Sequence, residues 1–120
     1  MAFKVERHKA NVHFYENGGS LEAHINVELT GRIEELTGGS GLLSRSNFRE
    51  HAQRQLETAV KDEILQTANK MQHELTVDGY NWLETMRRKQ YSMYQRHSAH
   101  WRDIFTDIKI VPNVSVNVNS

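Results

Sequence analysis

The chain has 120 residues, a length that fits one domain with a single modest core, and we expect residues 1–120 to form that one domain. Its 15 Lys and Arg balance its 15 Asp and Glu, so the formal net charge of zero provides no basic surplus for nucleic acid. Cys is absent, which excludes disulfides and thiolate zinc sites, and no apolar run of about 18 residues is present that could cross a bilayer.

The first third of the chain has the period-two pattern of β-strands. Apolar and polar residues alternate over about 3–8 and again over about 11–16, which predicts two short strands. The Asn-Gly-Gly-Ser sequence at 17–20 supplies the positive φ angles of a tight hairpin turn. Alternation then resumes and slackens at Gly31, so we expect a strand over about 21–36 with a bulge or bend near Gly31, followed by a Gly-rich loop at 37–41.

A long segment without Gly or Pro, from Asn47 to about Leu75, predicts one helix of roughly eight turns. Most of its apolar residues recur at every fourth position. Because a helical turn takes about 3.6 residues, this spacing rotates the apolar stripe around the helix. We therefore expect the two halves of the helix to have different partners, and Phe48 and Leu75 to share no buried neighbour.

The two partners of the long helix follow from this rotation. We expect the front half of the helix to pack on the strands, near Ile25 and Val116. The back half should hold a helical layer that extends from Tyr80 to Phe105, for which Asp78 is a plausible N-cap.

A last strand is predicted over about 107–118, where apolar residues again alternate with polar ones. Pro112 cannot donate to a ladder, which indicates an edge position or a bulge. The alternation continues to the last residues, so we expect the printed sequence to be a piece of a longer chain.

Together these elements predict an α+β domain with a four-stranded antiparallel sheet and a long helix and shorter helices packed on one face. The predicted core consists of apolar residues on the inward positions of these elements: Ile25, Val27, Leu29, Phe48, Leu56, Ile64, Trp101, Ile104, Phe105, Val114 and Val116.

The opposite face of this sheet is predicted to be polar and free of helices. We interpret it as a docking surface for another domain or subunit, the alternative being an ordinary solvated face. Its predicted members are the outward residues of the strands: His13, Tyr15, Glu22, His24, Asn26, Glu28, Lys109 and Asn113.

A short basic run, Arg87, Arg88 and Lys89, is a second candidate contact surface. It would attract anionic lipid headgroups or an acidic partner, unless it is simply a solvated helix face. His97 and His100 are three residues apart on a helix, but no further ligand stands at a spacing that would complete a zinc site. No catalytic constellation, phosphate loop or dinucleotide motif is present, so we predict no catalytic residue, cofactor or metal.

Three stretches match, in order and spacing, those of a known family: Phe3–Gly31, Asp78–Phe105 and Val114–Val118. The basic run at 87–89 falls where that family also carries one. Together these stretches resemble the C-terminal domain of the spore germination receptor C subunit, the Ger(x)C-type lipoprotein family. The family usually has glycines near Asn81 and Leu83, whose absence here predicts a more continuous helical segment.

The resemblance implies a non-enzymatic role in spore germination through protein–protein assembly. It implies integral membrane A and B subunits as partners and a lipid anchor outside this chain. It also implies a place on the outer face of the spore inner membrane, with the isolated domain monomeric. The alternative function is a nucleic-acid-binding α+β module, against which stand the zero net charge and a polar sheet face with Tyr15 as its one predicted aromatic residue.

Overall fold

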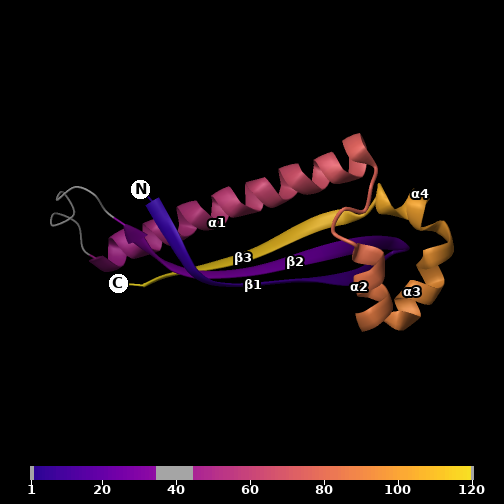
Figure 1. The fold of residues 1–120 in the computed structure, drawn as a ribbon, viewed down its shortest axis with the longest axis horizontal. Helices are drawn as coiled ribbons and strands as arrows, with labels where there is room; N and C mark the ends of the chain where they lie inside the picture. The colour runs from indigo at the N-terminus through magenta and orange to yellow at the C-terminus, as the bar shows by residue number, and fades with distance from the viewer. Residues whose placement is uncertain (1, 35–44, 120) are drawn as a thin grey trace.

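Three strands and a long helix that lies along them form the body of the molecule (Figure 1), which the computed structural model describes over residues 2–34 and 45–119. The predicted end of the strand at 35–36 and the Gly-rich loop at 37–41 lie outside these residues. The α+β class agrees with the prediction. The elements in chain order are β1 (Ala2–Asn17), β2 (Ser20–Glu34), α1 (Arg45–Asn69), the π-helix η2 (Lys70–Leu75), α2 (Trp82–Lys89), α3 (Tyr91–His97), the 3₁₀-helix η3 (Ser98–His100), α4 (Trp101–Phe105) and β3 (Lys109–Asn119).

The sheet has three strands rather than the predicted four, because β1 is continuous where two strands were expected. Its apolar residues change parity, from Phe3 and Val5 to Val12 and Phe14, and the pattern indicated a break. A β-bulge between Val5 and Arg7 absorbs this change, since an extra residue moves the following side chains to the other face. The bulge predicted near Gly31 therefore lies on the facing strand. The tight turn is confirmed, with positive φ at both Gly18 and Gly19.

The prediction that all strands are antiparallel was wrong. β1 and β2 are antiparallel, but β3 pairs in parallel with β2, from Glu22 opposite Lys109 to Arg32 opposite Asn119. The physical reason is one of length. The helix formed by α1 and η2 spans about 45 Å, and β2 spans about 50 Å, so the helix returns the chain to the beginning of β2. β3 then has to run in the same direction as β2.

The two halves of the long helix meet different partners, as predicted, and the contact of the front half with Val116 is confirmed, although that with Ile25 is not. In the front half, Glu57 and Gln53 accept hydrogen bonds from the backbone N–H groups of Val116 (3.2 Å) and Val118 (3.0 Å) on the open edge of β3. Ile25 does not lie under the front half; it borders a groove together with Ile64 of the back half. Leu75 is 58% exposed, so it anchors neither layer.

The main core lies at the end of the sheet where α2, α3 and α4 gather (Figure 1), rather than along the whole helix. Of the predicted core residues, Phe105 and Val116 are buried and the others are half-buried. The buried cluster consists of residues from β1, β2, η2, α2, α4 and the segment just before β3: Phe14, Leu21, Ala23, Met71, Trp82, Met86, Phe105 and Ile108.

The segment from α2 to α4 is less continuous than the missing glycines predicted. Gln90 has φ −138° and ψ 61°, which ends α2 before α3 begins. Asp78 does serve as a cap: its carboxylate accepts hydrogen bonds from the backbone N–H groups of Trp82 (2.8 Å) and Leu83 (3.0 Å). Short helices with fixed breaks can thus wrap around the end of the sheet. Among the described residues, no helix combines the length and apolar character needed to cross a membrane.

The π-helix η2 turns Gln72 into the core, where it is 2% exposed. Its Nε2 donates hydrogen bonds to the backbone carbonyls of Phe105 and Ile108, each at 2.9 Å. These bonds tie the end of the long helix to the chain that leads from α4 into β3. A buried amide is stable here because both of its donor hydrogens find acceptors.

We expect Gly31→Ala to lower the free energy of unfolding by about 1–3 kcal/mol, since overpacking against backbone cannot be relieved easily. A Cβ at Gly31 would lie 2.1 Å from the carbonyl oxygen of Lys4. Gly79→Ala is the matched control, because its Cβ would make ordinary contact with the side chain of Met71, at 3.7 Å from Sδ and 3.9 Å from Cγ. Urea denaturation of both variants measures the difference, and equal losses would show that β1 does not approach Gly31 this closely.

We expect Gln72→Leu to cost about 1–3 kcal/mol, because it removes the donors that satisfy buried carbonyl groups. Gln66→Leu, at an exposed position of α1, should change the stability by less than about 0.5 kcal/mol. Chemical denaturation followed by circular dichroism measures both. A Gln72→Leu variant as stable as the unsubstituted chain would contradict the role given to this amide.

Candidate functional site

The strand register assembles one face of the sheet from residues that the sequence predicted as a contact surface. Tyr15 lies opposite Glu22, which lies opposite Lys109, and the next row joins His13 to His24. We call this surface the polar face and define it by the residues His13, Tyr15, Glu22, His24, Asn26, Glu28, Lys109 and Asn113. The structure thus brings together the strand residues of the prediction.

A ladder of asparagine side chains crosses the three strands on the polar face. Asn26 Nδ2 donates to Asn11 Oδ1 at 2.9 Å, and Asn113 Nδ2 donates to Asn26 Oδ1 at 3.0 Å. The three residues stand in one row of the register, which places their amides within reach of one another. Cross-strand hydrogen bonds of this kind hold the side chains in fixed orientations.

Aromatic and imidazole rings pack edge to face beside this ladder. Ring centroids are 4.8 Å apart for His13 and Tyr15 and 4.4 Å apart for Tyr15 and His24. His24 Nε2 lies 3.1 Å from Glu22 Oε1, and Asn17 donates to the other carboxylate oxygen at 3.3 Å. The hydrogen bond from His24, followed by that from Asn17, lowers the pKa of Glu22 below its usual value.

The polar face presents histidine, glutamate and amide side chains from three strands. Its polar groups are engaged with one another on an open sheet. Within the described residues, no group of three or more His, Asp or Glu is arranged to hold a metal ion. His97, which the sequence suggested as a possible ligand, lies 3.2 Å from Glu16 Oε1 instead.

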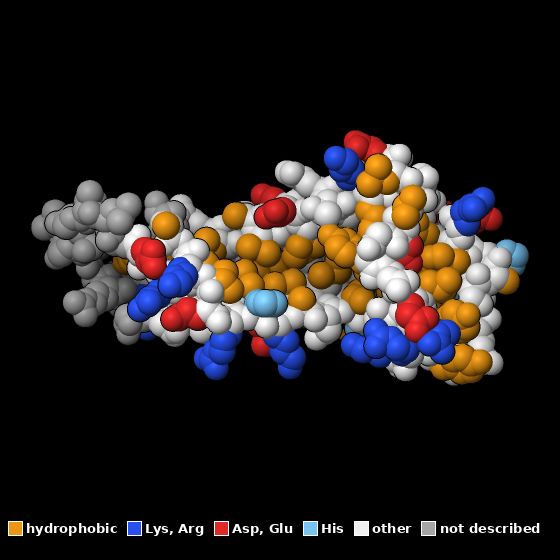
Figure 2. Space-filling view, in the orientation of Figure 1, with side chains coloured by type: hydrophobic (Ala, Val, Ile, Leu, Met, Phe, Trp, Pro, Cys, Tyr) orange, Lys and Arg blue, Asp and Glu red, His pale blue; other side chains and the backbone are white. Residues whose placement is uncertain are grey.

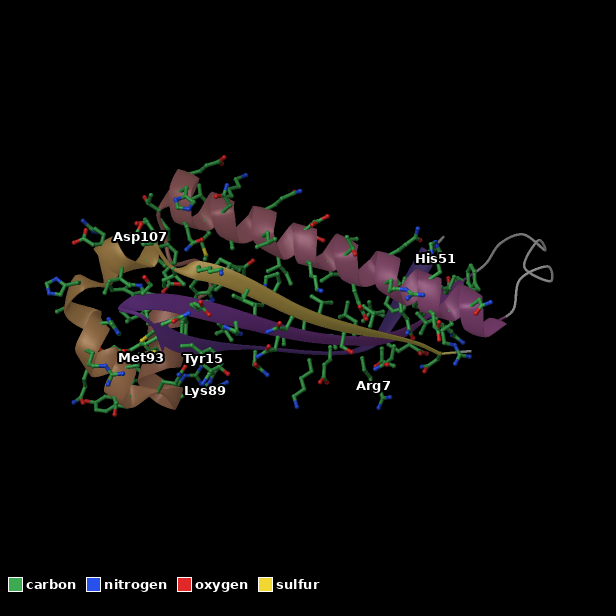
Figure 3. All side chains as sticks on the ribbon, turned by 180° about the vertical axis from the view of Figure 1, so that it is seen from behind. Arg7, Tyr15, His51, Lys89, Met93 and Asp107 are labelled. Carbon is green, nitrogen blue, oxygen red and sulfur yellow. The ribbon has the colours of Figure 1, made fainter. Side chains whose placement is uncertain are left out.

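The basic run belongs to a different surface from the polar face. Arg87 is held by Glu84, with Nε donating to Oε2 at 2.8 Å. Arg88 and Lys89 border a groove on the helix-bearing side of the sheet. Figure 3 shows Lys89 and Arg7 along the β1 side of the molecule, away from His51 on α1. The structure therefore places the polar face and the basic run at 87–89, both predicted as contact surfaces, on different parts of the molecule.

This groove has a volume of about 400 Å³ and exists because α1 packs along β3, which leaves β1 uncovered. Figure 2 shows hydrophobic side chains gathered between α1 and β1, with Lys and Arg side chains along the β1 border. Sequence reasoning missed it, because we expected the helices to cover the whole face. The sequence did contain a signal for this groove: the inward residues Ala10 and Val12 of β1 are small, so they leave space beside the strand. The main lining residues are Ala10, Val12, Ile25, Ile64, Trp82, Arg88 and Lys89.

A second hollow, of about 620 Å³, lies beside α4 and is lined in part by Asp78 and Trp101. The carboxylate of Asp78 is already engaged as the cap of α2. Trp101, predicted as core, is half-buried, and its Nε1 is a buried donor with no partner in the described residues. Arg102 and Asp103 also line this hollow, and we assign no function to it.

Comparison with known proteins gives one family and one solved structure. The family model described as "Spore germination B3/ GerAC like, C-terminal" matches residues 1–120. The crystal structure of the GerBC protein superposes with a TM-score of 0.83 over 98% of this chain at 19% identity, and at that identity the likeness concerns the fold alone. This chain spans 36% of the length of that structure. No curated protein matches the chain.

We expect His24→Ala to raise the pKa of Glu22 toward that of an ordinary glutamate, because the largest stabilisation of the carboxylate is lost. These hydrogen bonds stabilise the fold above the ordinary glutamate pKa, and their contribution is lost as the pH falls through the lowered pKa. NMR titration of the side-chain carboxyl carbons measures the change.

Glu16 provides an internal control in the same titration. Arg96, and to a lesser extent His97, lowers its pKa, so this value should not respond to His24→Ala. A Glu22 pKa that is unchanged in the variant would show that His24 does not hold the carboxylate in solution.

Proposed function

This chain belongs to the spore germination B3/GerAC-like C-terminal family, and on that premise we propose that it is a non-catalytic binding and assembly domain of a nutrient germinant receptor C subunit. The observation that carries the proposal is the family match along residues 1–120. The chemistry of the surface supports it. The polar face and the groove are built for contact, with polar groups that bond to one another and apolar residues left partly uncovered.

We further propose the partners and location of the complete receptor. The integral membrane A and B subunits are the protein partners, and the C subunit is held at the outer face of the spore inner membrane by a lipid anchor outside this chain. The domain itself contributes protein contacts and binds no nucleic acid. These proposals rest on family membership.

The polar face is the surface we propose for contact with another domain or subunit. Its asparagine ladder and its packed rings are ordered before any partner binds, which reduces the conformational entropy lost on association. Glu28 and Lys109 are exposed on this face and carry opposite charges. Such groups at the rim of an interface orient an incoming partner and exclude wrongly charged ones.

We expect the combined substitutions Glu28→Lys and Lys109→Glu, made in the full-length subunit, to reduce co-purification of the membrane subunits by about tenfold. Placing like charges across an interface costs at least about 1.4 kcal/mol, which corresponds to that factor. Germination of spores in response to nutrients should slow in parallel.

The matched control reverses the charges of Lys61 and Asp62, which are exposed on α1 and lie outside the polar face. This pair should leave assembly and germination as they are in the unsubstituted protein. If the Glu28 and Lys109 reversal is equally silent in both measurements, the polar face is not an assembly surface.

A further inference from the structure

At Phe14, on the outer edge of β1, the side chain of Gln90 makes the two backbone hydrogen bonds that a neighbouring strand would make. The backbone N–H of Phe14 donates to Gln90 Oε1 at 2.9 Å, and Gln90 Nε2 donates to the carbonyl of Phe14 at 2.7 Å. Both groups of Phe14 therefore point away from β2. Because N–H and C=O groups alternate in direction along a strand, Val12, Ala10 and His8 present theirs to the same side.

This part of the edge is open. β1 is the outermost strand of the sheet. In the part of the chain that the structure describes, no hydrogen bond outside the ladder with β2 reaches the backbone of His8, Ala10 or Val12. Unpaired N–H and C=O groups in a row are a template for another strand.

The groove adjoins this open edge. Ala10 and Val12 line it from β1, and Ile25 and Ile64 form its floor and far side. Asn11 also borders the groove, although its side chain lies on the polar face, bonded to Asn26. Asn11 can reach the groove only through its backbone, so the groove extends over the main chain of β1, the strand whose outer edge is open.

The charge around the groove has one sign. Arg88 and Lys89 flank it on α2, and neither Asp nor Glu is among the described residues that line it. On the other face of the same strand edge, Arg7 and Lys9 of β1 add further basic charge beside Thr30 and Glu28. Acidic side chains of a bound segment would be complemented here.

We propose that the edge of β1 from His8 to Val12 binds an extended segment of a partner protein by strand addition. The segment alternates apolar and acidic residues. Its backbone continues the pairing that Gln90 begins at Phe14, and its apolar side chains enter the groove beside Ala10 and Val12. Because side chains alternate between the two faces of a strand, its acidic side chains point to the other face, toward Arg7 and Lys9. This inference rests on the proposed role as a binding domain and names the kind of partner that the domain takes.

Two other occupants fit the surface less well. A helix in the groove would leave the N–H and C=O groups of the β1 edge without partners. A second copy of this chain would bring Lys4, Arg7 and Lys9 of its own β1 against the same three residues of the first copy. Repulsion between these like charges disfavours pairing of two β1 edges.

The test uses the 120-residue chain and a synthetic peptide of about ten residues that alternates Val and Glu, long enough to pair with residues 8–12. We expect binding by fluorescence anisotropy, and slowed amide hydrogen exchange at Ala10 and Val12. Ala10→Pro removes one outward N–H without touching the ladder to β2 and should weaken binding by about tenfold. Ala10→Ser, which keeps the N–H, should bind as the unsubstituted chain does.

Two further arms separate backbone pairing from charge. The same peptide with alternate backbone nitrogens methylated keeps its side chains but loses its ladder bonds, and we expect no measurable binding. Reversing the charges of both Arg7 and Lys9 by substitution with Glu should weaken binding of the Val–Glu peptide by about tenfold. The control, Lys61→Glu with Lys70→Glu, changes the net charge equally at exposed positions outside the groove and should have no effect.

The proposal is overturned if the Val–Glu peptide does not bind, or if Ala10→Pro and the methylated peptide bind equally well. It is also overturned if an acidic helical peptide binds unaffected by Ala10→Pro, or if the chain dimerises through β1 and excludes the peptide. These outcomes are independent of the germination assay. The peptide could bind even though the charge reversal of Glu28 and Lys109 has no effect on assembly or germination. That result would support strand addition and refute the assembly role of the polar face.

Discussion

A single helix is too narrow to cover three strands, and this constraint decides the arrangement of the rest of the molecule. A helix with its side chains is about 10 Å wide, whereas three strands span about 15 Å. α1 lies along β3, to which Glu57 and Gln53 attach it. β2 is then half covered and β1 is left bare along the middle of the sheet. The helices α2 to α4 close only one end, so the core gathers there.

Side-chain amides and carboxylates complete the hydrogen bonding wherever regular structure stops. Gln72 donates hydrogen bonds to the carbonyl groups just before β3, and Gln90 pairs with the backbone of Phe14 on the edge of β1. Asp78 caps the N-terminus of α2. Each supplies partners to backbone groups that would be costly to leave unsatisfied. These few bonds join segments that are distant in sequence. Gln90 in particular holds the end of α2 to β1, and Gln72 holds η2 to the segment that leads from α4 into β3.

The two sides of the sheet consequently differ in chemistry. On one side an ordered polar face is stiffened by the asparagine ladder and by packed rings. On the other side an apolar groove with a basic border meets an unpaired strand edge. This domain of the spore germination B3/GerAC-like C-terminal family thus carries two surfaces of different chemistry. The two surfaces can act separately, because β1 presents Asn11 and His13 to one side and Ala10 and Val12 to the other.

By itself the sequence determined the elements whose signals are local. Period-two alternation, the paired glycines at 18–19, the long helix and the capping Asp78 were all predictable, as were the residues of the polar face, because side-chain parity follows from the strand pattern alone. The tertiary structure alone decided what depends on pairing and coverage. The parity change at Glu6 became a bulge only because β2 continues opposite it, and β3 became parallel because the helix matches the sheet in length. Ala10 and Val12 became part of a groove only because α1 lies over β3, and no local pattern records which strand a helix will cover.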